Sequence, residues 1–136
     1  MKIPNSILSL SVVLFVTGCA TSYQSSGPTG GYGDTQLAPD AFRVVFSGNA
    51  YSTDEQAQDY ALLRASQVTI QHGFTCFAIT SEKYAMHSDP AHHTIVLFYQ
   101  PKEELAIRCY KTRPDAPFTY DAAFLQQSMK KKYHMK

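Results

Sequence analysis

The sequence lacks every short catalytic motif that would identify an enzyme directly. Its 136 residues contain no G-x-S-x-G nucleophile motif, no phosphate-binding P-loop and no dinucleotide-binding glycine pattern. No internal repeat is visible either. Since no catalytic constellation is present, we expect the protein not to be an enzyme and to need no cofactor.

An excess of charge of one sign is also missing. Lysine and arginine together number 12 and aspartate and glutamate 11, so the formal net charge at pH 7 is +1. Nucleic-acid-binding domains normally carry a clear surplus of basic residues. The balance therefore argues against nucleic acid as a partner, while a hydrophobic content of 44% is that of a globular protein.

Long hydrophobic runs are limited to one, close to the start of the chain. Residues 7–16 are apolar apart from Ser9 and Ser11, and Lys2 precedes them with a positive charge. A helix of this length spans about 15 Å, roughly half the hydrocarbon core of a membrane. The pattern is typical of a secretory signal peptide rather than of a transmembrane helix.

Cysteine is scarce, and the first of the three cysteines ends this segment in the sequence Val16-Thr17-Gly18-Cys19. The tetrapeptide resembles the lipobox of bacterial lipoproteins, in which the cysteine is acylated and becomes the first residue of the mature chain. We therefore expect residues 1–18 to be a lipoprotein signal peptide and Cys19 to carry a lipid that holds the protein on a membrane. The alternative is an ordinary signal peptide followed by a structural cysteine. By analogy with enterobacterial sorting, Ala20 favours the outer membrane, on its periplasmic face.

The next segment, residues 19–40, is rich in glycine, proline, serine and threonine and shows no apolar periodicity. That composition is typical of a flexible linker. We expect a tether that lets a single domain, residues 41–136, stand off from the membrane.

Regular hydrophobic periodicity begins at Phe42. Alternation of apolar residues over positions 42–46 predicts a half-buried strand. The sequence Ser52-Thr53-Asp54-Glu55 fits a capping box, so we expect a long helix to begin there and to end at Gly73. Three alanines recur within it at helical spacing, which would let the helix lie close against a sheet.

Three further strands and a short helix are expected after it. Residues 74–80, 94–99 and 105–111 predict strands, with a polar turn at Pro101 before the last, and residues 120–129 predict an amphipathic helix. Short polar connections favour antiparallel pairing, whereas the long helix can connect parallel neighbours. The predicted fold is α+β, a small, mostly antiparallel four-stranded sheet in the order strand-helix-strand-strand-strand-helix. The long helix would cover one face, and a basic tail would follow the last helix.

Two blocks of the chain carry a resemblance to known proteins: GGYGDTQLAPDAFRVVFSGNAYSTDEQAQDYALLRASQVTIQHGF and RCYKTRPDAPFTYDAAFLQ. They resemble a family of small Gram-negative envelope lipoproteins over roughly residues 30–130, most clearly in GNAYST and DYALLRASQ. The resemblance implies the fold and a location in the cell envelope, and it carries over no catalytic residue.

Three histidines, His87, His92 and His93, flank a polar turn. Together with Asp89 or Glu82 they supply enough nitrogen and oxygen ligands for weak zinc or copper binding. Their spacing matches no established metal motif, so a polar hairpin tip is the favoured interpretation and we expect no metal.

The other two cysteines, Cys76 and Cys109, are candidates for a disulfide because a secreted chain meets an oxidising compartment. In a plain meander they would lie at opposite ends of the sheet, farther apart than the roughly 7 Å between α-carbons that a disulfide permits. A bond would require the last strand to run beside the start of the second. We expect two buried thiols, and the disulfide remains open.

The role of Arg64 and that of the terminal lysines can each be interpreted in two ways. Arg64 is expected to extend a solvated guanidinium from the edge of the long helix, with an anion contact as the alternative. The terminal Lys130, Lys131, Lys132 and Lys136 are expected in a solvated tail, with contact to membrane phosphates as the alternative.

Together these features predict a lipoprotein that acts by protein–protein contact and has protein partners in the envelope. It would serve as an envelope-maintenance factor or as an accessory subunit of an envelope-spanning assembly such as a secretion system. The alternative is a periplasmic small-ligand or metal-binding module.

Overall fold

The computed structural model describes residues 19–86 and 100–136. The elements in chain order are β1 (Gly31–Ala38), β2 (Ala41–Ser47), α1 (Asp54–Gln71), β3 (Cys76–Met86), β4 (Pro101–Tyr110), β5 (Thr119–Asp121) and α2 (Ala122–Lys132). The expected signal peptide, residues 1–18, and the expected strand at residues 94–99 lie outside the described residues. Within the described ranges, neither helix combines the length and the apolar character needed to cross a membrane.

The strands form one sheet in the order β1-β2-β4-β3-β5, and every neighbouring pair is antiparallel. The α+β class and the antiparallel sheet are therefore confirmed, whereas the expected number of four strands is wrong because the described residues alone form five. The parallel pairing that the long helix could have connected does not occur among the described strands. The strands that α1 connects, β2 and β3, are separated by β4 and are not neighbours.

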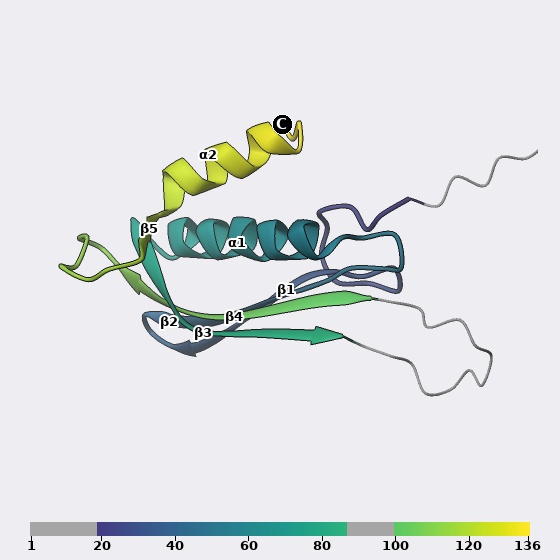
Figure 1. Cartoon of the computed structure of the whole chain (residues 1–136). Coiled ribbons are helices and arrows are strands. Elements are labelled where there is room, and N and C mark those ends of the chain that lie inside the picture. The colour runs from purple at the N-terminus through teal and green to yellow at the C-terminus, as the bar shows by residue number, and fades with distance from the viewer. Residues whose placement is uncertain (1–18, 87–99) are drawn as a thin grey trace, which may run out of the picture.

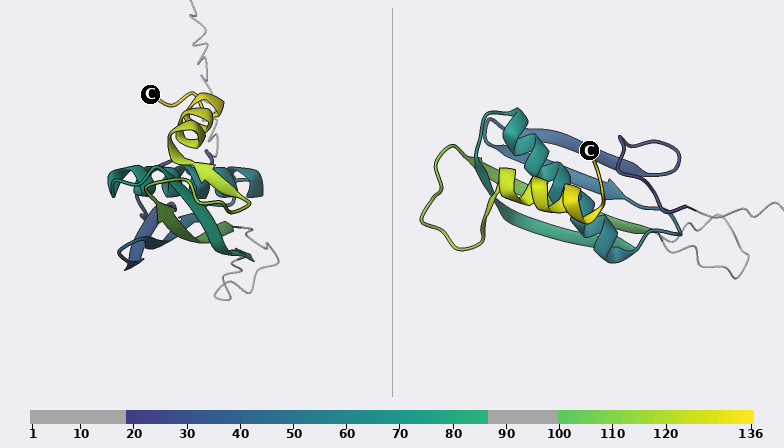
Figure 2. Two further views of the ribbon diagram at one scale, coloured as in Figure 1. Left: turned by 90° about the vertical axis from the view of Figure 1, so that its left-hand side faces the viewer. Right: turned by 90° about the horizontal axis from the view of Figure 1, so that it is seen from above.

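The molecule has three layers, namely the sheet, α1 and α2 (Figure 1). The helix α1 covers one face of the sheet, as the sequence predicts, and α2 lies over the outer side of α1 (Figure 2). Among the described residues no helix covers the other face. That face is polar: Arg43 Nε lies 3.4 Å from Glu104 Oε1, and Arg108 Nε lies 2.9 Å from Asp40 Oδ2.

The core lies between the sheet and α1. Alternation along β2 points Phe42, Val44 and Phe46 toward the helix, and each is at most 1% exposed. The helix contributes its small side chains to the same layer, and Ala57, Ala61 and Ala65 are fully buried, which confirms the close approach expected from the alanines. Removal of these apolar side chains from water is the main favourable term for the fold.

The ends of α1 follow local capping rules, with one correction. Thr53, not Ser52, is the N-cap, because Thr53 Oγ1 accepts a hydrogen bond of 3.1 Å from the amide of Gln56. At the other end Gly73 has a φ of +79°. Its amide donates to Ile70 O, in the left-handed termination that the glycine predicts.

The strand β1 was not expected, and it corrects the prediction of a flexible tether through residue 40. Residues Gly31–Ala38 pair with β2 along its whole length. Two glycines make the entry into β1 possible, since Gly30 and Gly31 have φ values of +97° and +133°. An added Cβ at Gly30 would lie 2.3 Å from the carbonyl oxygen of Ser47. The two glycines therefore allow two backbone segments to pack closely in a fixed arrangement, and they do not make this part of the chain flexible.

The polar sequence at the start of β4 was expected to be a turn, and this is wrong. Pro101 is the first residue of the strand, a position at which its missing amide hydrogen is tolerated. The strand then alternates between buried and partly exposed positions, and Glu103 takes a buried one. Because charged residues occupy both faces at the start of β4, the alternation of buried and exposed positions cannot be recognised there from the sequence.

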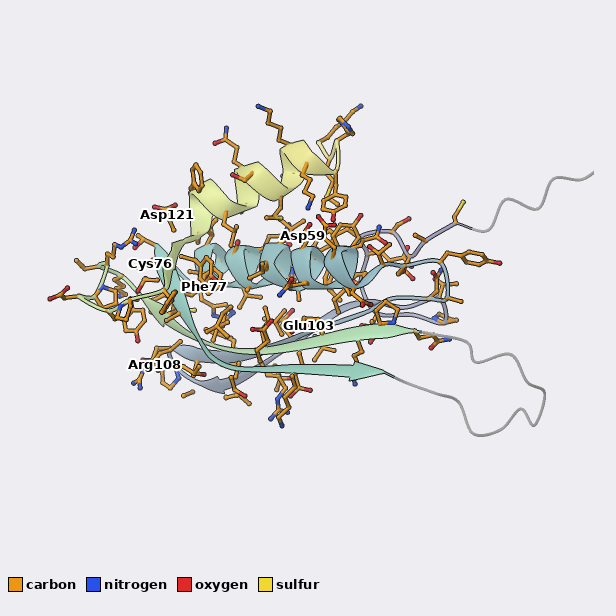
Figure 3. The ribbon with its side chains drawn as sticks, in the orientation of Figure 1. Asp59, Cys76, Phe77, Glu103, Arg108 and Asp121 are labelled. Carbon is orange, nitrogen blue, oxygen red and sulfur yellow. The ribbon has the colours of Figure 1, made fainter. Side chains whose placement is uncertain are left out.

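The end of the chain packs onto α1, which corrects the expected solvated tail. Asp59 of α1 accepts hydrogen bonds of 2.6 Å from Lys132 Nζ and 2.7 Å from Tyr133 Oη. The ring of Tyr133 lies edge-on to that of Tyr60, with centroids 4.8 Å apart. Figure 3 shows Asp59 on the side of α1 that faces α2.

Candidate functional site

Cys19 is the first described residue and is exposed, and the chain joins the folded body directly after it. The carbonyl of Cys19 accepts a hydrogen bond of 3.0 Å from Asn49 Nδ2. Two residues later, the amide of Thr21 donates to Ser52 Oγ at 3.2 Å, and Thr21 is only 3% exposed. The backbone next to the expected lipid is therefore held by the loop between β2 and α1.

Residues 20–30, called here the N-terminal segment, are held by aromatic packing as well. The ring of Tyr23 lies 4.6 Å from that of Tyr32 and 5.4 Å from that of Tyr60, measured between centroids. Its hydroxyl donates to Gln67 Oε1 at 2.6 Å. Burial raises the pKa of Tyr23 well above its usual value. The N-terminal segment is thus part of the domain, and a lipid on Cys19 would hold the domain without a long spacer.

The loop that contacts Cys19 also presents an aromatic side chain. The amide of Tyr51 donates to Asn49 Oδ1 at 3.0 Å, while its side chain is 64% exposed. Tyrosine suits the boundary between water and lipid because its ring is apolar and its hydroxyl is polar. This end of the molecule, named the anchor end, therefore carries Cys19 and Tyr51 together.

The opposite end presents two phenylalanines beside β5. Phe118, just before β5, is 86% exposed and has a φ of +59°, and Phe124 in the first turn of α2 is 70% exposed. In Figure 3 Asp121, the last residue of β5, lies at the far end of the molecule from the start of the described chain. A bulky residue in the left-handed region is strained, and strain of this kind concentrates at functional positions. We name this end the aromatic end.

A third feature is a cleft between the start of α1, the middle of β3 and the start of β4, named the acidic cleft. It is lined by Asp54, Glu55, Gln58, Glu82 and Glu103. Glu103 points from β4 toward α1 and is 2% exposed (Figure 3). Among the described residues, Glu103 Oε1 is a buried side-chain oxygen without any hydrogen-bond partner.

Two effects disfavour a charge on Glu103. Burial raises the pKa of Glu103 to about 7, and the neighbouring carboxyl of Glu82 adds to the rise by repulsion and by hydrogen bonding to the protonated form. Glu82 itself accepts a hydrogen bond of 3.1 Å from Gln58 Nε2. The carboxyl of Glu103 therefore keeps its proton to higher pH than an exposed glutamate does.

The expected histidine tip can be followed only in part. His87, Asp89, His92 and His93 lie outside the described residues, while Glu82 lies in the acidic cleft. Within residues 19–86 and 100–136, no group of three or more histidine, cysteine, aspartate or glutamate side chains is arranged to hold a metal.

Cys76 and Cys109 are both buried and are not joined to each other. The argument that placed them at opposite ends of the sheet is wrong, because β3 and β4 are neighbours and Cys109 pairs with Phe77. One step of register still separates the cysteines, so the pleat directs their side chains to opposite faces. Cys109 Sγ lies 3.3 Å from Thr69 Oγ1 on the helix side, and burial raises the pKa of the thiol.

Arg64 is not the solvated side chain that the sequence predicts. Its Nη2 lies 2.6 Å from Asp34 Oδ1, and its guanidinium lies 4.5 Å from the centroid of the Tyr32 ring. Both partners belong to β1. Because the sequence did not predict β1, it did not reveal a partner for the arginine either. Arg64 therefore joins α1 to the edge strand.

The acidic cleft was missed by sequence reasoning, although one signal for it exists. A period of two extended back from Leu105 places Glu103 on the buried face of β4. A buried glutamate in a strand is unusual enough to mark a site.

No protein-family model, curated protein or solved structure matches the chain.

Proposed function

We propose that the protein is a lipoprotein held through Cys19 on the periplasmic face of the outer membrane and that it acts by contact with other proteins. Its role would be that of an envelope-maintenance factor or of an accessory subunit of an envelope-spanning assembly such as a secretion system. The observation that supports this most is the polarity of the domain, with the anchor end and the aromatic end at opposite extremes.

The anchor end suits a short attachment. A lipid on Cys19 would place the loop of Asn49 and Tyr51 at the membrane surface. The N-terminal segment is hydrogen-bonded to the domain and therefore provides no flexible spacer between the domain and the lipid. Several acyl chains are needed for a stable anchor, and an exposed tyrosine at the interface adds to them.

The aromatic end suits a protein partner. Phenylalanines are enriched at the centres of protein interfaces, where a few buried aromatic side chains supply most of the binding energy. Phe118 and Phe124 are the two most exposed large hydrophobic residues among those described. With the anchor at the membrane, this end is directed away from it and toward partners in the periplasm.

A photo-crosslinking experiment tests the contact. Replacing Phe118 by the photoreactive analogue p-benzoylphenylalanine in the full-length protein preserves an aromatic side chain at this position. We expect illumination of intact cells of the source bacterium to yield a defined adduct of higher mass.

The matched control places the same analogue at Thr35, an exposed residue of β1. It should give no such adduct. Equal labelling at both positions, or no adduct at Phe118, would contradict contact through the aromatic end.

A further inference from the structure

We propose that the acidic cleft binds a primary ammonium group, supplied by a free polyamine or by a lysine side chain of another protein. The buried carboxyl of Glu103 would be its principal partner. The residues that line the cleft differ from those that define the anchor end and the aromatic end, so it would be a second binding function of the domain.

The unsatisfied oxygen of Glu103 points to a ligand. A buried carboxyl oxygen without a hydrogen bond costs free energy, and folded proteins rarely retain such an atom unless something else satisfies it. Glu103 is 2% exposed, yet it lines a cleft that opens to solvent. A donor that enters the cleft can therefore reach an oxygen that no described group of the protein satisfies.

The charges around Glu103 favour a cation. Glu82 faces it from β3, and Asp54 and Glu55 line the cleft from α1. Lys132 of α2 binds Glu55 and Asp59 through its Nζ at the rim of the cleft. No salt bridge to Glu82 or Glu103 occurs within the described part of the chain.

An ammonium group fits these carboxyls better than a metal ion does. A metal needs several oxygens converging on one point, and the described residues provide no such group of ligands. An ammonium group instead has three N–H donors that can reach separate oxygens through hydrogen bonds of about 2.8 Å. Lys132 already shows this chemistry at the rim, where one ammonium bridges the carboxylates of Glu55 and Asp59.

Binding of the ammonium group competes with the proton on Glu103. Because burial and Glu82 raise the pKa of Glu103 to about 7, the carboxyl is largely protonated at pH 6 and largely ionised at pH 8. The ammonium group prefers the ionised carboxylate, so its binding releases a proton. The affinity should therefore increase about tenfold from pH 6 to pH 8.

Calorimetric titration of the full-length protein, purified in detergent, tests the proposal with 1,5-diaminopentane as the probe. We expect one molecule to bind per chain, and binding to weaken by about tenfold or more in Glu103→Gln, which keeps the shape and removes the charge. Glu104→Gln is the matched control, because Glu104 lies on the opposite face of β4 and pairs with Arg43. It should change the affinity by less than about twofold. If Glu103→Gln does not melt cooperatively, Glu82→Gln replaces it with the same expectation.

Four further probes, namely tetramethylammonium, a lysine peptide, its acetylated form and calcium, decide the chemistry and the source of the ligand. Tetramethylammonium, which has no N–H donor, should not bind, and a lysine peptide should lose affinity when its side-chain amine is acetylated. Tighter binding of the diamine than of the peptide identifies a free polyamine, whereas the reverse identifies a protein lysine. Absence of binding by both amines, equal binding to Glu103→Gln, or equal binding of tetramethylammonium or calcium would overturn the proposal.

Discussion

At the scale of single residues, partners rather than residue types decide what each polar side chain does. Ser52 was expected to cap α1, but its hydroxyl accepts from the amides of Thr21 and Asn49 instead. Glu103 sits in a run of charged residues and is nevertheless buried. In each case the sequence supplies a group able to hydrogen-bond, and the fold selects the partner.

The buried carboxyl of Glu103 makes stability depend on pH. Its pKa rises from 4.5 in the exposed state to about 7 in the folded state, so the folded chain keeps a proton that the unfolded chain releases between these values. The contribution of this group to stability is therefore present below pH 4.5 and is lost as the pH rises to 7. Relative to the wild type, Glu103→Gln should gain about 2–3 kcal/mol in unfolding free energy between pH 5 and pH 8.

Urea unfolding at the two pH values, in buffers without amines, measures this change. Glu104→Gln serves as the control, and its difference from the wild type should stay nearly constant. A constant difference for Glu103→Gln as well would show that the carboxyl is solvated and ionised in the folded protein.

At the scale of elements, the N-terminal segment and β1 change the description of the molecule most. Both were expected to be flexible because residues 19–40 are rich in glycine, proline, serine and threonine and show no apolar periodicity. Yet the residues that matter there are aromatic or β-branched, since Tyr23 and Tyr32 pack against the domain and Thr21 is buried. A few such contacts offset the entropy that the glycines lose on ordering.

Ser52→Ala should release the N-terminal segment from the domain. The variant leaves the amides of Thr21 and Asn49 without their acceptor, at a cost of about 1–3 kcal/mol. Hydrogen exchange at Thr21 should accelerate accordingly. Thr53→Ala is the contrasting variant, because loss of the N-cap should destabilise α1 by about 1 kcal/mol and leave the Thr21 amide protected. Unchanged protection of Thr21 in Ser52→Ala would mean that aromatic packing alone holds the segment.

For the molecule as a whole, the short connection between Cys19 and the domain would determine how a lipid-anchored domain is oriented at a membrane. The domain cannot reorient freely if the N-terminal segment stays packed, so the anchor end should lie at the membrane and the aromatic end away from it. The proposed location therefore implies that partners bind on the side of the domain that faces away from the membrane.

Fluorescence quenching measures this orientation, because the protein has no tryptophan and a single introduced one reports alone. In vesicles containing lipids with spin labels near the headgroup, Tyr51→Trp of the lipidated protein should be strongly quenched. Phe118→Trp, at the aromatic end, should be quenched little.

The same measurement tests the anchor. Adding Cys19→Ser to Tyr51→Trp should remove the quenching, because without acyl chains the domain leaves the vesicle. Equal quenching of Tyr51→Trp and Phe118→Trp would show that the domain has no fixed orientation. Persistent quenching in the Cys19→Ser variant would show that the lipid is not what holds it.

Features that depend on local periodicity could be predicted from the amino-acid sequence alone. The alternation of Phe42, Val44 and Phe46 predicted β2, and the alanine spacing and Gly73 predicted a long helix that packs closely and ends where it does. These elements need only their own side chains to define a buried face. The α+β class follows from them.

Which segments pair with one another became clear only from the three-dimensional fold. The pairing of β4 between β2 and β3, the ordering of β1, and the burial of Glu103 all join residues far apart in the chain. The entropic cost of closing a loop grows only slowly with the number of residues in it, so separation along the sequence does not reveal which strands pair. The acidic cleft is assembled from α1, β3 and β4, and its chemistry exists only where these three elements come together.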